Sequence, residues 1–153
     1  MLETGPDPIQ TCLREAARQV LETMCFVTVE APDPSAPPPE PSWWLEVDFR
    51  GDPSGRFHLG LSEEAAATAA ANFLGAEPGA PVGKGDTANV LLEMANMICG
   101  ATLSCLENGR PFELSSPRLL EGAPVWRPGS AACVLPLDCG GAVMRLWLDL
   151  DRG

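Results

Sequence analysis

Four residues at helical spacing have the types and positions that could do chemistry in this sequence. Asn89, Glu93, Asn96 and Gly100 follow one another at intervals of three or four residues, within a segment that is otherwise mainly apolar. At 100° per residue, the other three lie within about 60° of Glu93 on a helical wheel. The spacing predicts a helix that is buried over most of its circumference and exposes one narrow polar stripe. These four residues lie along the stripe, and Asp86, Ser104 and Glu107 continue it toward the helix ends.

A solvated helix face would also produce a polar stripe, so the residue pattern leaves two interpretations open. A generic exposed face usually mixes Lys or Arg with acidic residues in i,i+4 pairs, and this stripe contains neither. Gly100 removes side-chain bulk from the stripe at a cost of ~1 kcal/mol in helix stability. Both features are compatible with a binding or reaction surface, but the residue pattern alone does not exclude an ordinary solvated face, and Asn89 could equally be a solvated residue.

The centre of the stripe resembles a known signature. Leu92–Gly100 is similar to the E-x-x-N-x-x-x-G motif of the CheC/CheX/FliY chemotaxis phosphatases, with Glu93, Asn96 and Gly100 at the defining positions. The order of the remaining predicted elements also follows that family, over roughly residues 9 to 150.

The end of the first predicted helix narrows the resemblance to one type. Leu21–Phe26 is similar to the corresponding segment of CheX-type proteins. CheC-type members carry a second E-x-x-N there, whereas in this sequence Glu22 is followed by Cys25 where asparagine would be needed. The resemblance therefore favours the single-site CheX type.

The resemblance implies a function, namely hydrolysis of the aspartyl phosphate on a CheY-type receiver domain. It implies that Asn96 positions the attacking water and that Glu93 pairs with a lysine of the regulator. Asn89 and Gly100, which lie on the same stripe, are the candidate binding residues. An acyl phosphate has a good leaving group and the receiver domain holds its own Mg²⁺, so the phosphatase needs no cofactor or metal of its own. An amide suits the role of Asn96 because it both donates and accepts hydrogen bonds.

Two other functions remain open. A non-catalytic adaptor of the same fold would bind a receiver domain without hydrolysis, and the intact Glu93 and Asn96 count against it. A metal or thiol hydrolase has no supporting set of residues, because the six cysteines form no C-x-x-C pair and the chain has one histidine. We expect Cys99 to lie in the core, and His58 to be a surface residue on the outer face of its strand without an acidic or cysteine partner.

Hydrophobic periodicity and turn residues predict the elements that must position the stripe. The predicted helices are Ile9–Phe26, a short alanine-rich helix from the N-cap Ser62 to about Leu74, and the stripe helix from the N-cap Asp86 to about Asn108. The predicted strands are Trp43–Arg50, a run around Phe57–Leu61, Phe112–Ser115 resuming around Arg118–Leu120, Ala131–Leu137 and Val143–Leu150. The order α-ββ-αα-βββ predicts an α+β fold, with two long helices and a short one packed on one side of an antiparallel sheet. The resemblance implies that this fold is CheC/CheX-like.

Residues 1–153 are expected to form a single domain, interrupted by an exposed proline-rich loop at residues 31–42. Just after this loop, Trp43 and Trp44 cannot both face the core of one strand. One of them could contact a dimer or partner surface, or be sheltered by a loop or sheet edge.

The charge balance excludes some partners. There are 21 acidic against 10 basic residues, a net charge of −11, and Lys84 is the single lysine. Nucleic acid and anionic membranes are therefore poor partners. We also expect no membrane span, because no stretch approaches ~18 apolar residues, and no signal peptide. The prediction is a reduced, cytoplasmic protein, and the resemblance adds a homodimer.

Overall fold

The computed structural model describes residues 8–24, 41–51, 54–77, 82–106, 112–122, 131–138 and 143–150. The helices are α1 (Pro8–Met24), α2 (Glu63–Phe73) and α3 (Lys84–Leu106). The strands are β1 (Trp43–Arg50), β2 (Gly55–Leu61), β3 (Glu113–Leu114), β4 (Arg118–Leu120), β5 (Ala131–Asp138) and β6 (Val143–Leu150). Several predicted features fall outside the described residues: the proline-rich loop except for its last two positions, the last two residues of the first predicted helix, and the predicted end of the third.

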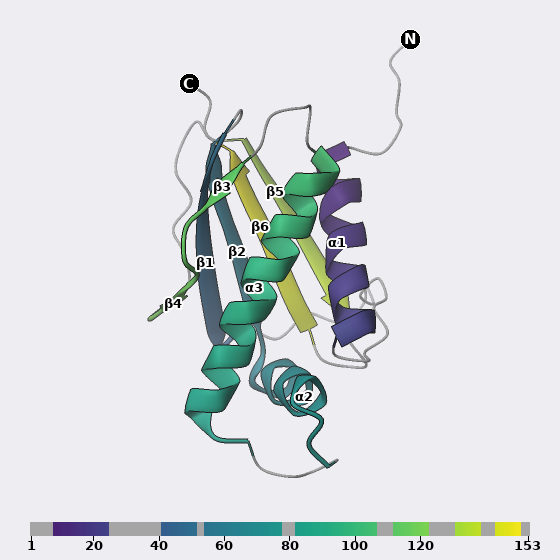
Figure 1. Ribbon diagram of the computed structural model, residues 1–153, viewed down its shortest axis with the longest axis vertical. Coiled ribbons are helices and arrows are strands. Elements are labelled where there is room, and N and C mark those ends of the chain that lie inside the picture. The colour runs from purple at the N-terminus through teal and green to yellow at the C-terminus, as the bar shows by residue number, and fades with distance from the viewer. Residues whose placement is uncertain are drawn as a thin grey trace.

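One antiparallel sheet forms the frame of the fold. Its strand order is β3-β1-β2-β6-β5, and β4 also pairs with β1. The helices α1 and α3 lie side by side across one face of this sheet, while α2 lies near one end of it (Figure 1). The predicted α+β architecture, with helices on one side of an antiparallel sheet, is confirmed.

Alternation along the strands builds the core between sheet and helices. On β1, Leu45 and Val47 are fully buried toward the helices, and β2 and β6 contribute the same kind of residue. The largest fully buried side chains are Leu13, Leu21, Leu45, Phe57, Leu59, Leu61, Leu91, Met94, Ile98, Met144, Leu146 and Leu148. Because α1 and α3 both contribute to this core, the sheet fixes their positions relative to each other.

The segment predicted as one interrupted strand forms two short strands instead. Phe49 of β1 pairs with Leu114 of β3, and Trp44 of β1 pairs with Leu120 of β4. These partners are five residues apart on β1 but six residues apart on the segment that contains β3 and β4. The extra residue indicates a bulge between β3 and β4. Pro117 lies in this bulge, where its missing N–H removes no ladder hydrogen bond.

The helix boundaries follow local capping chemistry. Ser62 caps α2 as predicted, since its hydroxyl accepts a hydrogen bond from the Ala65 N–H at 3.1 Å. The prediction that Asp86 caps α3 is wrong. The helix begins at Lys84, and the Gly83 carbonyl already accepts from the Thr87 N–H at 2.9 Å. Asp86 lies within the first turn, where its negative charge interacts favourably with the positive end of the helix dipole.

The prediction that His58 is a partnerless surface residue is also wrong. His58 lies on the sheet face away from the helices, as predicted, but only 4% of its surface is exposed. Its Nε2 lies 2.8 Å from Glu46 Oε2, and Arg118 of β4 contacts the other oxygen of the same carboxylate. The strand register explains this cluster, because Glu46 pairs with both His58 and Arg118 across neighbouring strands.

The two adjacent tryptophans of β1 are both sheltered. Trp43 is half-buried on the helix side, and its Nε1 donates a hydrogen bond to Glu63 Oε1 of α2 at 2.5 Å. Trp44 is 6% exposed on the opposite face, where it packs edge-on against Trp147 with ring centroids 6.2 Å apart. Neighbouring strands and α2 therefore account for both side chains.

By length and composition, α3 is an exception to the expectation that no stretch could cross a membrane. Among the described residues it is the one helix that qualifies, with a mean hydropathy of 1.3 over 18 residues. However, Leu91, Met94 and Ile98 are fully buried inside the fold. The core helix of a globular domain has this composition, so the hydropathy is weak grounds for a membrane span.

Candidate functional site

The polar stripe lies on the outward side of α3. Asn89 and Glu93 are exposed, and Asn96 and Gly100 are half-buried. The side of the helix beneath them is closed, because Met94, Ala95, Ile98 and Cys99 are fully buried. The predicted arrangement of a buried helix with a narrow polar stripe is thus observed, and the stripe is presented on a rigid element.

A groove runs between α1 and α3 beside the stripe, with a volume of about 420 Å³. From α3 it is lined by Asn96, Met97, Gly100 and Ala101, and from α1 by Gln19, Val20 and Thr23. Asn96 and Gly100 therefore meet in one hollow, whereas Asn89 and Glu93 lie outside its lining. Glu93 precedes the groove by one helical turn.

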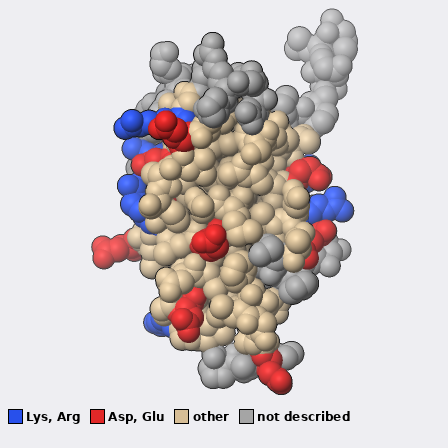
Figure 2. All heavy atoms as spheres, in the orientation of Figure 1, with Lys and Arg blue, Asp and Glu red and all other residues tan. Residues whose placement is uncertain are grey.

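The groove carries no formal charge among the residues that the structure describes. Figure 2 shows the face on which α1 and α3 lie: uncharged residues make up most of it, acidic side chains stand apart, and Lys and Arg gather at its edges. The described part of the chain contains no cluster of three or more His, Cys, Asp and Glu side chains that could hold a metal ion.

The first helix contributes groove residues that the sequence did not single out as functional. Gln19 and Thr23 face Asn96 and Gly100 across the groove. Periodicity places Gln19 on the polar side of α1, but nothing in the sequence shows that this side meets α3. That contact comes from tertiary packing, so the α3 half of the groove was predictable and the α1 half was not.

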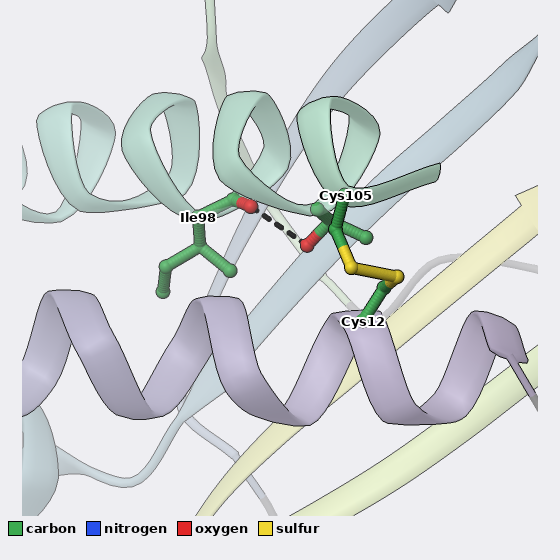
Figure 3. The surroundings of a disulfide bond; sticks show 4 residues. Cys12, Ile98 and Cys105 are labelled. Carbon is green, nitrogen blue, oxygen red and sulfur yellow. Dashed lines mark hydrogen bonds between the residues drawn. A yellow bond between two sulfur atoms is a disulfide. The ribbon is translucent and has the colours of Figure 1, made fainter. Parts of the chain in front are cut away.

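A disulfide bond links α1 and α3 beyond the groove. Cys12 of α1 is bonded to Cys105 of α3; their Cα atoms are 5.6 Å apart, and their sequence separation is 93 (Figure 3). The prediction of a reduced protein is therefore wrong for these two cysteines. A second hollow of about 450 Å³ lies beside the bond and shares Gln19, Thr23 and Ala101 with the groove. Sequence spacing could not indicate a pair that only the antiparallel packing of α1 and α3 brings together.

Cys99 lies in the core, as predicted. It is fully buried, and desolvation raises the pKa of its thiol from 9.0 to about 12. A thiol that stays protonated is a weak nucleophile, so Cys99 is unsuited to covalent catalysis.

The chemistry that this site can supply is orientation. The Asn96 amide can donate two hydrogen bonds and accept others, and it lies in a hollow open to solvent, where a water molecule can be held. Among the described residues, no cysteine, histidine or charged side chain lines the groove. A reaction at this surface would therefore take its electrophile from a bound partner.

Comparisons with known proteins agree with this fold. A family model described as chemotaxis phosphatase CheX matches residues 46–137. No curated protein sequence matches the chain.

The chain is also similar to solved structures of chemotaxis proteins. CheX from Desulfovibrio desulfuricans superposes with a TM-score of 0.79 at 18% identity, covering 95% of this chain and 100% of that one. CheX from Vibrio vulnificus gives 0.77 at 16% identity, covering 97% and 100%. A CheX-CheY-BeF3-Mg²⁺ complex from Borrelia burgdorferi gives 0.73 at 19% identity, covering 95% and 99%. At these identities the likeness concerns the fold.

Proposed function

The chain belongs to the family of chemotaxis phosphatase CheX, and from that premise we propose that it hydrolyses the aspartyl phosphate of a CheY-type receiver domain. The observation that carries the proposal is the position of Asn96, a half-buried amide in an open, uncharged groove on the outward side of a rigid helix. This is the geometry expected of a residue that inserts beside a partner's phosphoryl group and orients water.

In the proposed reaction, the oxygen of water attacks the phosphorus and the bond from phosphorus to the aspartyl oxygen breaks. The products are inorganic phosphate and a free carboxylate. Asn96 aligns the attacking water through its amide, which removes much of the entropic cost of bringing the reactants together. Mg²⁺ on the receiver domain would stabilise charge on the phosphoryl oxygens, and the BeF3 and Mg²⁺ in the Borrelia burgdorferi complex are consistent with that source.

Glu93 acts as the docking residue in this proposal. It is exposed one turn from Asn96 on the same side of α3, outside the lining of the groove. A carboxylate in that position can reach a lysine of the partner while Asn96 enters the phosphate site. Asn89 and Gly100 extend the same contact surface along the helix.

An assay with an Mg²⁺-loaded, phosphorylated receiver domain tests the proposal. We expect the wild-type chain to accelerate phosphate release, Asn96→Ala to abolish most of the acceleration while still binding, and Glu93→Ala to weaken binding. If wild type binds the receiver but releases phosphate no faster than Asn96→Ala, the protein is the non-catalytic adaptor and the catalytic proposal fails.

The proposal has three further parts. We infer that residues 1–153 act as one domain, in line with similar structures that match 95–97% of this chain. We also propose a homodimer, which light scattering on the purified chain would test, and a cytoplasmic site of action, where receiver domains work. The net charge of −11 supports a partner other than nucleic acid or an anionic membrane.

A further inference from the structure

The disulfide joins the two helices that build the proposed docking groove. Cys12 lies near the start of α1 and Cys105 near the end of α3, and the bond spans the gap between the antiparallel helices (Figures 1 and 3). Cys105 follows Asn96 by nine residues, roughly 13 Å along the helix axis. The bond therefore lies at one end of a continuous surface whose other end carries Asn96.

The two sulfur-bearing residues differ in accessibility. Cys105 is exposed, whereas Cys12 is only 7% exposed. The 450 Å³ hollow beside them is open and is lined by polar residues of α1, including Glu15, Arg18 and Glu22. A partner thiol can therefore reach the bond from solvent, at the Cys105 side.

We propose that Cys12 and Cys105 form a thiol–disulfide exchange site for a dithiol reductant, and that its redox state sets how tightly the receiver domain docks. The regulatory half of this inference rests on the proposed function. Receiver domains work in a reducing compartment, where accessible disulfides are more often regulatory or catalytic than permanent. A cross-link that touches the docking groove is well placed for regulation.

The exchange balances as an ordinary two-step reaction. A thiolate of the reductant attacks Cys105 Sγ, the Cys12–Cys105 bond breaks, and Cys12 leaves as a thiolate that takes up a proton. The second thiol of the reductant, as its thiolate, then attacks the mixed disulfide and releases Cys105. The protein ends with two thiols, and the reductant ends as a disulfide.

Reduction is expected to change docking more than turnover. The core residues Leu13 and Ala17 keep α1 packed on the sheet in either state, so the helix does not detach. The cross-link restrains the start of α1, and Gln19 and Thr23 lie two to three turns further along that helix, on the α1 side of the groove. Asn96 belongs to α3 and keeps its own buried support.

The test compares oxidised wild-type chain with the same protein reduced by dithiothreitol. Peptide mass mapping first identifies the Cys12–Cys105 bond and its loss. Calorimetry then measures binding to a BeF3-loaded receiver, and a phosphate-release assay gives KM and kcat. We expect reduction to weaken binding and raise KM about threefold or more, to leave kcat within about twofold, and to be reversed by reoxidation.

Two variants serve as controls. Cys105→Ser should behave like reduced wild type and no longer respond to dithiothreitol, whereas Cys99→Ala, with its thiol in the core, should keep the full response. Equal binding and KM in both redox states, or an unchanged response in Cys105→Ser, would overturn the inference. If binding responds to reduction but neither form releases phosphate, the exchange site stands and the catalytic proposal fails instead.

Discussion

Gly100 is a glycine that the packing of the fold does not require, so a bound partner is the remaining structural reason for it. A Cβ atom at this position would meet only Leu114 Cδ2, at 3.9 Å, which is ordinary van der Waals contact. The described structure therefore gives no packing reason for a glycine in the middle of α3, although glycine weakens a helix interior. A close approach by a bound partner would explain it.

Gly100→Ala should separate stability from function. We expect the variant to be more stable by about 0.5–1 kcal/mol in urea unfolding, because alanine is the better helix former. Since the added methyl group projects from the proposed contact surface, we expect KM for a phosphorylated receiver to rise severalfold. Thr68→Ala, at an exposed position of α2 away from the proposed contact surface, is the control and should leave KM unchanged. A Gly100→Ala protein with wild-type KM would remove Gly100 from the binding surface.

Cys99 gives the protein a predictable response to alkaline pH. Burial raises the pKa of its thiol to about 12, above the unfolded value near 9. The stabilising contribution is complete below pH 9 and declines from there toward pH 12, because only the unfolded chain loses the proton. We expect urea unfolding free energies to fall over this window by up to about 1 kcal/mol per pH unit from this group. The chain contains no tyrosine, so no phenol titrates in the same window. The unfolding free energy of Cys99→Ala should fall less steeply with pH than that of the wild type, and equal slopes for the two proteins would contradict this prediction.

At the level of elements, the sequence predicted what depends on local patterns. The alternation in β1 and the N-cap of α2 each depend on a few neighbouring residues, and both were predicted correctly. The bulge between β3 and β4 depends on how two short segments pair with one strand. His58 is buried by partners from β1 and β6, 12 and 89 residues away in sequence. The α1 side of the groove likewise depends on which face of α1 meets α3, which no local pattern encodes.

The N-cap of α2 offers a test of an element remote from the proposed chemistry. Ser62 is 9% exposed and accepts the Ala65 N–H, so Ser62→Ala leaves a helix donor without that partner. We expect a loss of about 1 kcal/mol in unfolding free energy and no change in phosphate release. Ser62→Asp, which can cap equally well, should restore the stability. A lowered kcat in either variant would mean that α2 takes part in positioning the stripe.

At the scale of the whole molecule, the Cys12–Cys105 bond encloses most of the described fold. Its two cysteines are 93 positions apart in sequence, so the ring includes both sides of the groove, α2, and the strands β1 and β2 in full. A ring of this size restricts the unfolded chain strongly, by about 4–5 kcal/mol in the chain-entropy model.

Reduction should therefore lower the thermal stability of the whole domain. We expect differential scanning calorimetry to show a clear drop in the Tm of the wild-type chain when dithiothreitol is added. The Tm of Cys105→Ser should already be as low as that of the reduced wild type and should not change with dithiothreitol. A Tm that is the same with and without reductant would mean that the bond adds no net stability.

The central claim is that Asn96 orients water for attack on a partner's aspartyl phosphate, and single-turnover phosphate release tests it most directly. The chain is present in saturating excess over a phosphorylated, Mg²⁺-loaded receiver domain. Under this condition the rate constant for phosphate release reports the chemical step independently of binding. We predict that Asn96→Ala lowers this rate constant about 100-fold or more, whereas Asn89→Ala, on the same stripe but outside the groove, stays within about threefold of wild type. An Asn96→Ala protein that releases phosphate as fast as wild type at saturation would contradict the account.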